Sequence, residues 1–353
     1  MRKGWIDYAR GIAIILVVYK HVLLGFLAGG IVVSDYIYNA QEFFYNLRMP
    51  LFFIVSGLFI TNSIQRRTRQ QFFQYKFDTI FYPYFVWATL YLTLKIVAGP
   101  YINFSMDPSA YIDVLIRPRT IDHFWYLYTL FVIIMLNAGY QWTVGIDKKI
   151  PLILLALMMY FLSFVVNEDY MALNDVLFYF LFMVIGILAS NFILAEKNRE
   201  LLSSFKLFFI VLPFFVASQL YWLFYMRLEA PGVGSVGVVR LTELTGWARI
   251  WCIPMIMLGC FFLLNVASIL DRYNLARVIR NVGKHSLYIY IMHLMAIGAV
   301  RVILMKTFLR DHADVFFVVV FVAGIGLPIA IYQLSMKMGM WYLYTPRRPS
   351  KKP

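Results

Sequence analysis

The chain consists mainly of long apolar blocks, mostly about 17–22 residues each, that are separated by short polar stretches. A helix needs about 20 predominantly apolar residues to cross the hydrocarbon core of a bilayer. The strands of a membrane barrel alternate apolar and polar residues, and these blocks lack that alternation. The blocks therefore predict an all-α, polytopic integral membrane protein with one transmembrane domain over residues 1–353.

The composition supports this prediction, because 62% of the residues are hydrophobic and 14% are charged, whereas a soluble domain carries about a quarter charged residues. We expect about ten transmembrane helices. The second and fifth spans are short, so we expect them to tilt less or to lie partly at the interface. The predicted spans are residues 10–29, 49–63, 78–98, 123–140, 151–167, 172–194, 206–226, 247–268, 285–306 and 315–336.

Charged residues are distributed unevenly over the predicted loops. With the N-terminus in the cytoplasm, 21 of the 32 Lys and Arg residues fall on the inner side, and 12 of the 18 Asp and Glu residues fall on the outer side. Cytoplasmic loops are enriched in Lys and Arg, so we expect both termini in the cytoplasm. The net charge of +14 is explained by this bias and by the attraction of basic residues to anionic lipid headgroups. It does not indicate a nucleic-acid partner. A basic cytoplasmic rim also suits an anionic substrate.

Two features of the sequence are expected to carry no chemistry. Cys252 and Cys260 lie in one apolar block, about 80° apart around a helix, so we expect inert thiols with no disulfide and no metal site. Residues 232–237 match the GxGxxG pattern, but a dinucleotide site needs a strand before the pattern and a helix after it. We interpret residues 232–237 as a flexible external loop.

Arg10 and His21 form the most informative pair, because charged or titratable groups within a span are costly and commonly mark function. They are eleven positions apart, which is three helical turns plus about 20° and about 16 Å of rise. The two side chains therefore share one face, with Arg10 at the cytoplasmic rim and His21 near the middle of the membrane. Asp7 falls on nearly the same face, one turn below Arg10, where the two can pair.

Two further polar residues lie deep in predicted spans. Lys20 points about 100° away from His21, towards either a polar cavity or another helix. His293 lies eight residues, about 12 Å, into the ninth span, at a depth similar to that of His21. A hydrogen-bonded packing role stays open for His293. The depth of His21 and the arginine aligned with it favour a functional role for His21.

Arg66 and Arg69 lie in the loop after the second span, and they would be neighbours if that segment is helical. Paired guanidinium groups can hold phosphates through forked hydrogen bonds. A topological anchor at the inner membrane surface is the alternative interpretation.

Five short motifs, in order along the chain, resemble the acyltransferase 3 family of membrane O-acyltransferases. The first helix of that family carries a basic residue, ten further residues and then a histidine, as Arg10 and His21 do here. The fourth motif departs from the family pattern, because Tyr126 replaces the usual Phe. The opening is similar to sugar O-acetylases of the fucose O-acetylase type. The motifs are WIDYARGIA (5–13) with His21, RMPLFFIVSG (48–57), the Arg66–Arg69 pair, HFWYL (123–127) and GKHSLYIYIMH (283–293).

The resemblance implies transfer of an acyl group, acetyl by default, from cytoplasmic acyl-CoA to a hydroxyl of a glycan or lipid-linked sugar at the outer face. His21 is then the general base, or the nucleophile of an acyl-histidine intermediate. The expected CoA contacts are Arg10, Arg66 and Arg69. The residues expected to bind the acceptor or to support the site are Arg48, Trp125, His293, Asp7 and Lys20. The expected location is the bacterial inner membrane.

Other functions fit a chain of this class. A flippase or transporter of a polar, lipid-linked glycan is the main alternative. Coupled transporters place acidic groups or broken helices at mid-membrane, often in inverted repeats. The sequence shows neither a mid-span acid nor a repeat, which leaves a passive flippase open. A glycan polymerase is expected to carry large outer loops, whereas the longest predicted here are about 20–25 residues.

Overall fold

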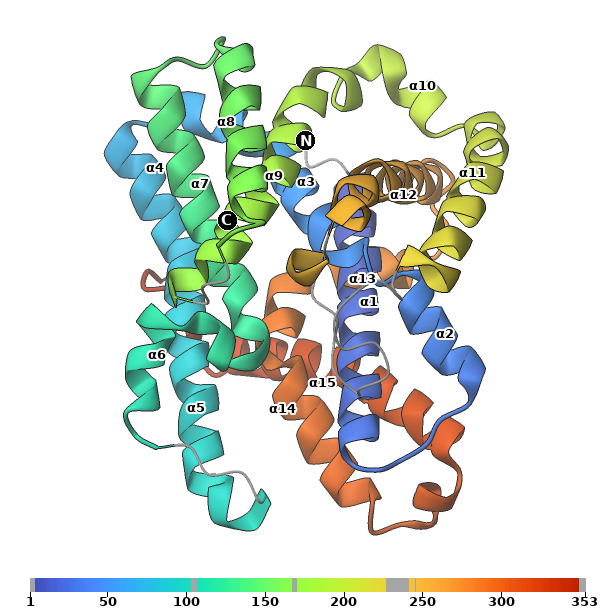
Figure 1. Ribbon diagram of the computed structural model, residues 1–353. Coiled ribbons are helices and arrows are strands. Elements are labelled where there is room, and N and C mark those ends of the chain that lie inside the picture. Colours follow the sequence, from blue (N-terminus) through green and yellow to red (C-terminus); the bar gives the residue numbers. More distant parts are fainter. Residues whose placement is uncertain (1–3, 103–106, 167–169, 227–240, 245, 349–353) are drawn as a thin grey trace. The chain divides into compact units, whose positions relative to one another are not determined.

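All the regular elements of the described residues are helices, which confirms the all-α class (Figure 1). The computed structural model describes residues 4–102, 107–166, 170–226, 241–244 and 246–348. The motif at residues 232–237 therefore lies outside the described residues.

Each of the ten predicted spans coincides with a helix. The ten helices are α1 (Gly4–Ala28), α3 (Arg48–Gln65), α5 (Tyr82–Ile102), α7 (Trp125–Thr143), α8 (Lys149–Leu162), α9 (Leu173–Ile193), α11 (Phe205–Phe224), α12 (Gly246–Arg272), α14 (Ser286–Leu304) and α15 (Ala313–Lys337). Shorter helices that the sequence analysis did not anticipate lie between them. They include α2 (Asp35–Phe43), α4 (Arg69–Lys76), α6 (Ala110–Ile116), α10 (Arg199–Leu202) and α13 (Arg277–Lys284).

Eight helical segments within the described residues are long and apolar enough to cross a membrane, which makes the chain a multi-pass membrane protein. The other two predicted spans fall on α7 and α8. Helix α7 has 19 residues but carries the polar Asn137 and Gln141 in its second half. Helix α8 has 14 residues, about 21 Å of rise, and so is shorter than the hydrocarbon core, as expected for the short fifth span.

Two spans are longer than predicted because short helices extend them. Helix α2 leads through the turn at residues 44–47 into α3, so the apolar segment Asp35–Gln65 has 31 residues. Helix α4 leads through a π-helical turn, η1 (Phe77–Phe81), into α5, and Arg69–Val97 has 29 residues. The predicted second span of 15 residues was therefore too short at its N-terminal side.

The chain divides into two compact units. Unit 1 contains Met1–Val55 and Ala189–Ile331, and unit 2 contains Ser56–Leu188 and Tyr332–Pro353. Helices α3, α9 and α15 each contribute residues to both units.

In unit 1 the N-terminal half of α1 packs closely against α13 (Figure 1). A Cβ atom added at Gly283 would collide with the backbone of Asp7 and Gly11 on α1, so glycine is needed for this approach. The Tyr8 hydroxyl donates to the Leu275 carbonyl oxygen at 2.6 Å, just before α13 begins. These contacts anchor the start of α1 to the segment that leads into α14.

The C-terminal half of α1 contacts α14 and α15. The Arg301 guanidinium of α14 donates to the Gly25 carbonyl oxygen. Rings of α15 lie against rings of α1, with centroids 4.7 Å apart for Phe26 and Phe316 and 4.9 Å apart for Tyr19 and Phe317. Because α14 follows α13 and reaches Gly25 near its end, α14 runs in the same direction as α1.

In unit 2, aromatic packing and one buried ion pair hold the helices. The rings of Tyr160 on α8 and Phe178 on α9 have centroids 5.3 Å apart. Arg119 donates two hydrogen bonds to the carboxylate of Asp175, at the start of α9, and Asp175 is almost fully buried. The indole of Trp87 on α5 donates to the Leu343 carbonyl oxygen at 2.8 Å.

Candidate functional site

The structure brings His21 and His293 together within unit 1. His21 is half-buried on α1, and His293 is fully buried on α14. Their ring centroids are 5.0 Å apart, with an angle of 54° between the ring planes. Each histidine was identified from the sequence, but their proximity was not. It arises because α14 runs alongside α1 in the same direction.

The backbone of α14 fixes the orientation of the His293 ring. Its Nδ1 lies 2.7 Å from the Tyr290 carbonyl oxygen and 3.1 Å from the Ile289 carbonyl oxygen. A carbonyl oxygen can only accept, so Nδ1 carries the proton in these hydrogen bonds. In the neutral ring, Nε2 is then the acceptor.

Helix α1 is continuous from Gly4 to Ala28, so Arg10 and His21 share one face as the spacing predicts. Arg10 is half-buried, three turns before His21. Asp7 is almost fully buried at the start of the helix. Arg10 therefore lies on the face of α1 that carries His21, about 16 Å along the helix from it.

Lys20 lies near the ring of Tyr45, which belongs to the turn between α2 and α3. The Lys20 Nζ is 5.9 Å from the Tyr45 ring centroid, and the Arg48 guanidinium carbon is 4.6 Å from the same centroid. Arg48 is buried and donates to the Gln41 side-chain oxygen at 2.5 Å. The Tyr45 ring in turn stacks on Trp222 of α11, with centroids 6.0 Å apart. Two cations therefore share one aromatic ring in the interior of unit 1.

The turn at residues 44–47 between α2 and α3 supplies this ring and an additional buried amide. Asn46 is fully buried, and neither its side-chain nitrogen nor its oxygen has a hydrogen-bond partner within the described residues. A buried amide without partners is costly, and a bound water, ion or ligand can satisfy it. Sequence reasoning missed Tyr45 and Asn46. The polar residues directly before the second apolar block were the available signal.

Arg66 and Arg69, in unit 2, do not share a helical face. Arg66 follows the last residue of α3, and Arg69 is the first residue of α4. Thr68 separates them as an N-cap, in a capping box with Gln71. Both arginines are exposed, and the Arg69 guanidinium lies 5.6 Å from the Trp142 ring centroid. The prediction that Arg66 and Arg69 would be neighbours on one helix is therefore wrong. A ligand bound by both would be held across the turn between α3 and α4.

Trp125, also in unit 2, is held by neighbouring side chains. The Arg119 guanidinium carbon lies 4.2 Å from the indole centroid, and the Tyr179 ring centroid lies 5.6 Å away. Arg119 also makes the ion pair with Asp175. Trp125 is thus part of a packed aromatic and ionic cluster.

The central feature of the site is therefore a pair of imidazoles in contact between two apolar helices of a membrane protein. The comparison with protein families makes the class specific. The acyltransferase 3 family model, described as an acyltransferase domain, matches residues 3–333, so the chain belongs to this family. The comparisons with curated proteins and with solved structures found no match.

Proposed function

We propose that the protein transfers an acyl group, acetyl by default, from cytoplasmic acyl-CoA to a hydroxyl of an exported glycan or lipid-linked sugar. The observation that carries this proposal is the pair of His21 and His293, which lie 5.0 Å apart on two apolar helices of an acyltransferase-family chain.

His21 is the proposed general base. An imidazole nitrogen takes the proton of the acceptor hydroxyl as the oxygen forms a bond to the thioester carbonyl carbon. The tetrahedral intermediate then expels the CoA sulfur, which receives that proton from the imidazolium of His21. The products are the O-acyl sugar and free CoA. In the two-step variant, a nitrogen of His21 attacks the thioester and the CoA thiol leaves with the displaced proton. The acceptor hydroxyl then attacks the acyl-imidazole, and the free imidazole is restored as the hydroxyl proton is released.

His293 is the proposed positioning residue for His21. Two imidazoles joined by an N–H···N hydrogen bond of about 2.9 Å have ring centroids about 5 Å apart. The observed 5.0 Å is compatible with that arrangement. Because the Nδ1 of His293 faces backbone carbonyls, its Nε2 can accept from an N–H of His21. Such a bond would orient His21 and set which of its nitrogens is the base.

The donor is proposed to contact Arg10 with its phosphates and to extend along α1. The rise of about 16 Å from Arg10 to His21 is comparable to a pantetheine arm of roughly 15–20 Å. The nucleotide can then stay at the membrane surface while the thioester reaches His21. Arg66 and Arg69 are proposed as further phosphate contacts because they are exposed guanidinium groups in the segment that resembles the family's Arg-x-x-Arg.

The acceptor is proposed to bind near the cations around Tyr45. Arg48 and Lys20 can donate to sugar hydroxyls, and Asn46 is an additional buried donor and acceptor. Trp125 and Asp7 keep their proposed supporting roles. The helix break at residues 44–47 within one apolar segment is also the feature that favours the flippase alternative.

The decisive assay uses purified protein with radiolabelled acetyl-CoA and glycan extracted from cells that lack the gene. Label transferred to the glycan supports an acyltransferase, whereas a flippase moves glycan without consuming acetyl-CoA. Mass spectrometry of the surface glycan from cells with and without the gene then identifies the acceptor by the missing acetyl increment.

Orientation can be tested with single cysteines, because Cys252 and Cys260 are both buried and should not react with a membrane-impermeant maleimide. We propose cytoplasmic termini in a bacterial inner membrane. Arg277→Cys should then be labelled only after the cells are opened, and Arg310→Cys in intact spheroplasts; both positions are exposed. The reverse labelling pattern would contradict cytoplasmic termini, and with them the proposal that acyl-CoA binds from the cytoplasm.

A further inference from the structure

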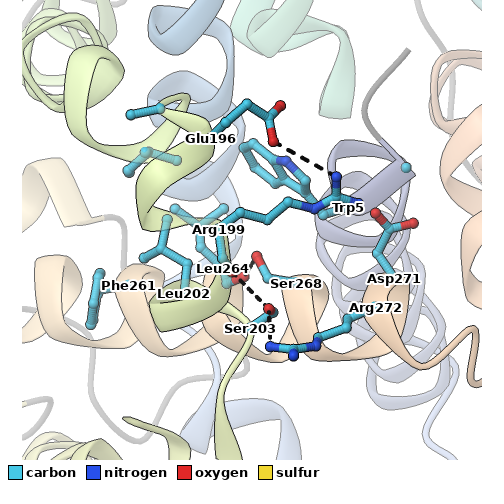
Figure 2. Close-up of a pocket in the computed structure, with 13 residues that line it drawn as sticks. Trp5, Glu196, Arg199, Leu202, Ser203, Phe261, Leu264, Ser268, Asp271 and Arg272 are labelled. Carbon is cyan, nitrogen blue, oxygen red and sulfur yellow. Dashed lines mark hydrogen bonds and ion pairs between the residues drawn. The ribbon is translucent and has the colours of Figure 1, made fainter. Parts of the chain in front are cut away.

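Unit 1 contains a cavity of about 470 Å³ at the N-terminal end of α1 (Figure 2). Its walls are formed by four parts of the chain: the start of α1, the end of α9, the α10 segment and the second half of α12. The lining includes Trp5, Glu196, Arg199, Phe261, Asp271 and Arg272. Because α1 is long and apolar enough to cross the membrane, its first residues lie at one membrane surface, and so does the cavity.

The polar part of the lining contains two positively charged and two negatively charged side chains. In Figure 2 the Arg199 side chain extends towards Trp5 and Glu196, and the Arg272 guanidinium lies beside Ser203. The Arg199 guanidinium lies 3.7 Å from a carboxylate oxygen of Glu196, and Arg272 donates to the Ser203 hydroxyl at 3.3 Å. Asp271 adds a second carboxylate. The formal charges of the lining residues therefore cancel, which suits a zwitterion better than a dianion.

The remaining lining is apolar and aromatic. Leu202 and Leu264 are buried, Phe261 is half-buried, and Trp5 sits in the second position of α1. Tryptophan is enriched at membrane–water interfaces, where its ring contacts both the apolar and the polar zone. A ligand with a charged head and an apolar chain satisfies both parts of this lining.

The cavity lies on a different face of α1 from the histidine pair. Trp5 and Arg10 are five positions apart, about 140° around the helix, and Trp5 and His21 are sixteen positions apart, about 160°. A ligand in the cavity therefore lies away from the face that joins Arg10 to His21. The acyl donor needs that face, so the cavity is suited to a different molecule.

We propose that this cavity binds the headgroup of an aminophospholipid from the adjacent leaflet, with phosphatidylethanolamine as the class. The phosphate contacts Arg199 and Arg272 through charge-assisted hydrogen bonds. The ammonium group donates to Glu196 and Asp271, and the first part of the acyl chains lies against Trp5 and the leucines. This site is independent of the transfer reaction.

The test measures which lipids stay bound to the full-length protein. The protein is purified from nanodiscs of equal parts phosphatidylethanolamine, phosphatidylglycerol and phosphatidylcholine, and retained lipids are counted by native mass spectrometry. Phosphatidylethanolamine should dominate. Phosphatidylcholine has the same charges but no N–H to donate, and phosphatidylglycerol has no cation. Equal retention of the three lipids, or a preference for phosphatidylglycerol, would overturn the proposal.

Two double variants test the arginines and the carboxylates of the cavity separately. Arg199→Ala with Arg272→Ala should lower retention of every lipid at this site by about tenfold, as expected for losing charge-assisted hydrogen bonds. Glu196→Gln with Asp271→Asn keeps the side-chain shapes, and should shift the preference from phosphatidylethanolamine to phosphatidylglycerol. Arg277→Ala with Arg310→Ala is the matched control, because these exposed arginines do not line the cavity.

Two further outcomes would contradict the proposal. The preference for phosphatidylethanolamine could survive the Glu196→Gln and Asp271→Asn pair, which would show that the carboxylates do not select the amine. Acetyl-CoA could displace the bound lipid from wild type but not from the Arg199→Ala and Arg272→Ala pair, which would make the cavity a donor site. Size-exclusion profiles that match wild type establish that each variant is folded.

Discussion

The polar centres of the two units are built differently. In unit 2, Arg119 and Asp175 neutralise each other through two hydrogen bonds, and Trp125 packs over the arginine. In unit 1, two imidazoles lie in contact, and the cationic groups of Lys20 and Arg48 lie 5.9 and 4.6 Å from the ring centroid of Tyr45. An ion pair of opposite charges has a structural role without any reaction, whereas an imidazole can accept or donate a proton during a reaction. We therefore propose that the chemistry takes place at the histidine pair of unit 1, and that the ion pair of unit 2 stabilises the fold.

The largest effect should come from His21. His21→Ala should lower acyl transfer by about 10²–10⁴-fold, because it removes the general base. The measurement is label transfer from acetyl-CoA by purified protein, with folding checked by size exclusion. His312→Ala is the matched control, since His312 is an exposed histidine of unit 1. Retained activity in His21→Ala would remove this residue from the mechanism.

Removing the ion pair of unit 2 should lower the stability of the protein rather than the rate of acyl transfer by the folded protein. Arg119→Ala leaves the buried Asp175 without this ion-pair partner, and should lower the free energy of unfolding by about 3–5 kcal/mol. Arg119→Leu with Asp175→Leu should recover most of that loss. Thermal unfolding in detergent measures both variants. If folded Arg119→Ala protein turns over as slowly as His21→Ala, the division between a chemical and a structural centre is wrong.

His293 tests whether the contact between the imidazoles matters. His293→Leu should lower kcat by about ten- to a hundredfold and leave the KM for acetyl-CoA unchanged, because an orienting partner acts on the chemical step. His293→Gln keeps a hydrogen-bond acceptor near the position of Nε2, and should recover part of kcat. Equal loss in both variants with lowered thermal stability would mean that His293 only packs.

The smallest expected effect concerns the exposed arginines of unit 2. Arg66→Ala with Arg69→Ala should raise the KM for acetyl-CoA by about tenfold, because phosphate contacts at an exposed surface are moderate in strength. Arg67→Ala is the matched control, since Arg67 packs 4.1 Å from the Tyr75 ring centroid and donates to Ser63. A fall in kcat with no change in KM would exclude a role in donor binding.

Most of the fold was predictable because a continuous apolar segment of the sequence specifies each long helix. An apolar block of about 20 residues has few alternatives to a membrane helix, and all ten blocks are helical. The shorter helices α2 and α4 were missed because they are mixed in polarity and brief. Missing α4 also made the adjacency of Arg66 and Arg69 wrong, since a capped helix start at Thr68 interrupts the segment.

The sequence by itself determined that Arg10 and His21 align, because the angle between two residues on one continuous helix depends only on their spacing. It also identified His293 as a deep polar residue. Only tertiary structure decided that His293 meets His21, that Lys20 faces Tyr45, and that a charged cavity opens beside Trp5. These relations depend on the close approach of α13 to α1 at Gly283, on the direction that this gives α14, and on the turn between α2 and α3. Contacts between segments far apart in the chain are set by packing, and no local pattern encodes them.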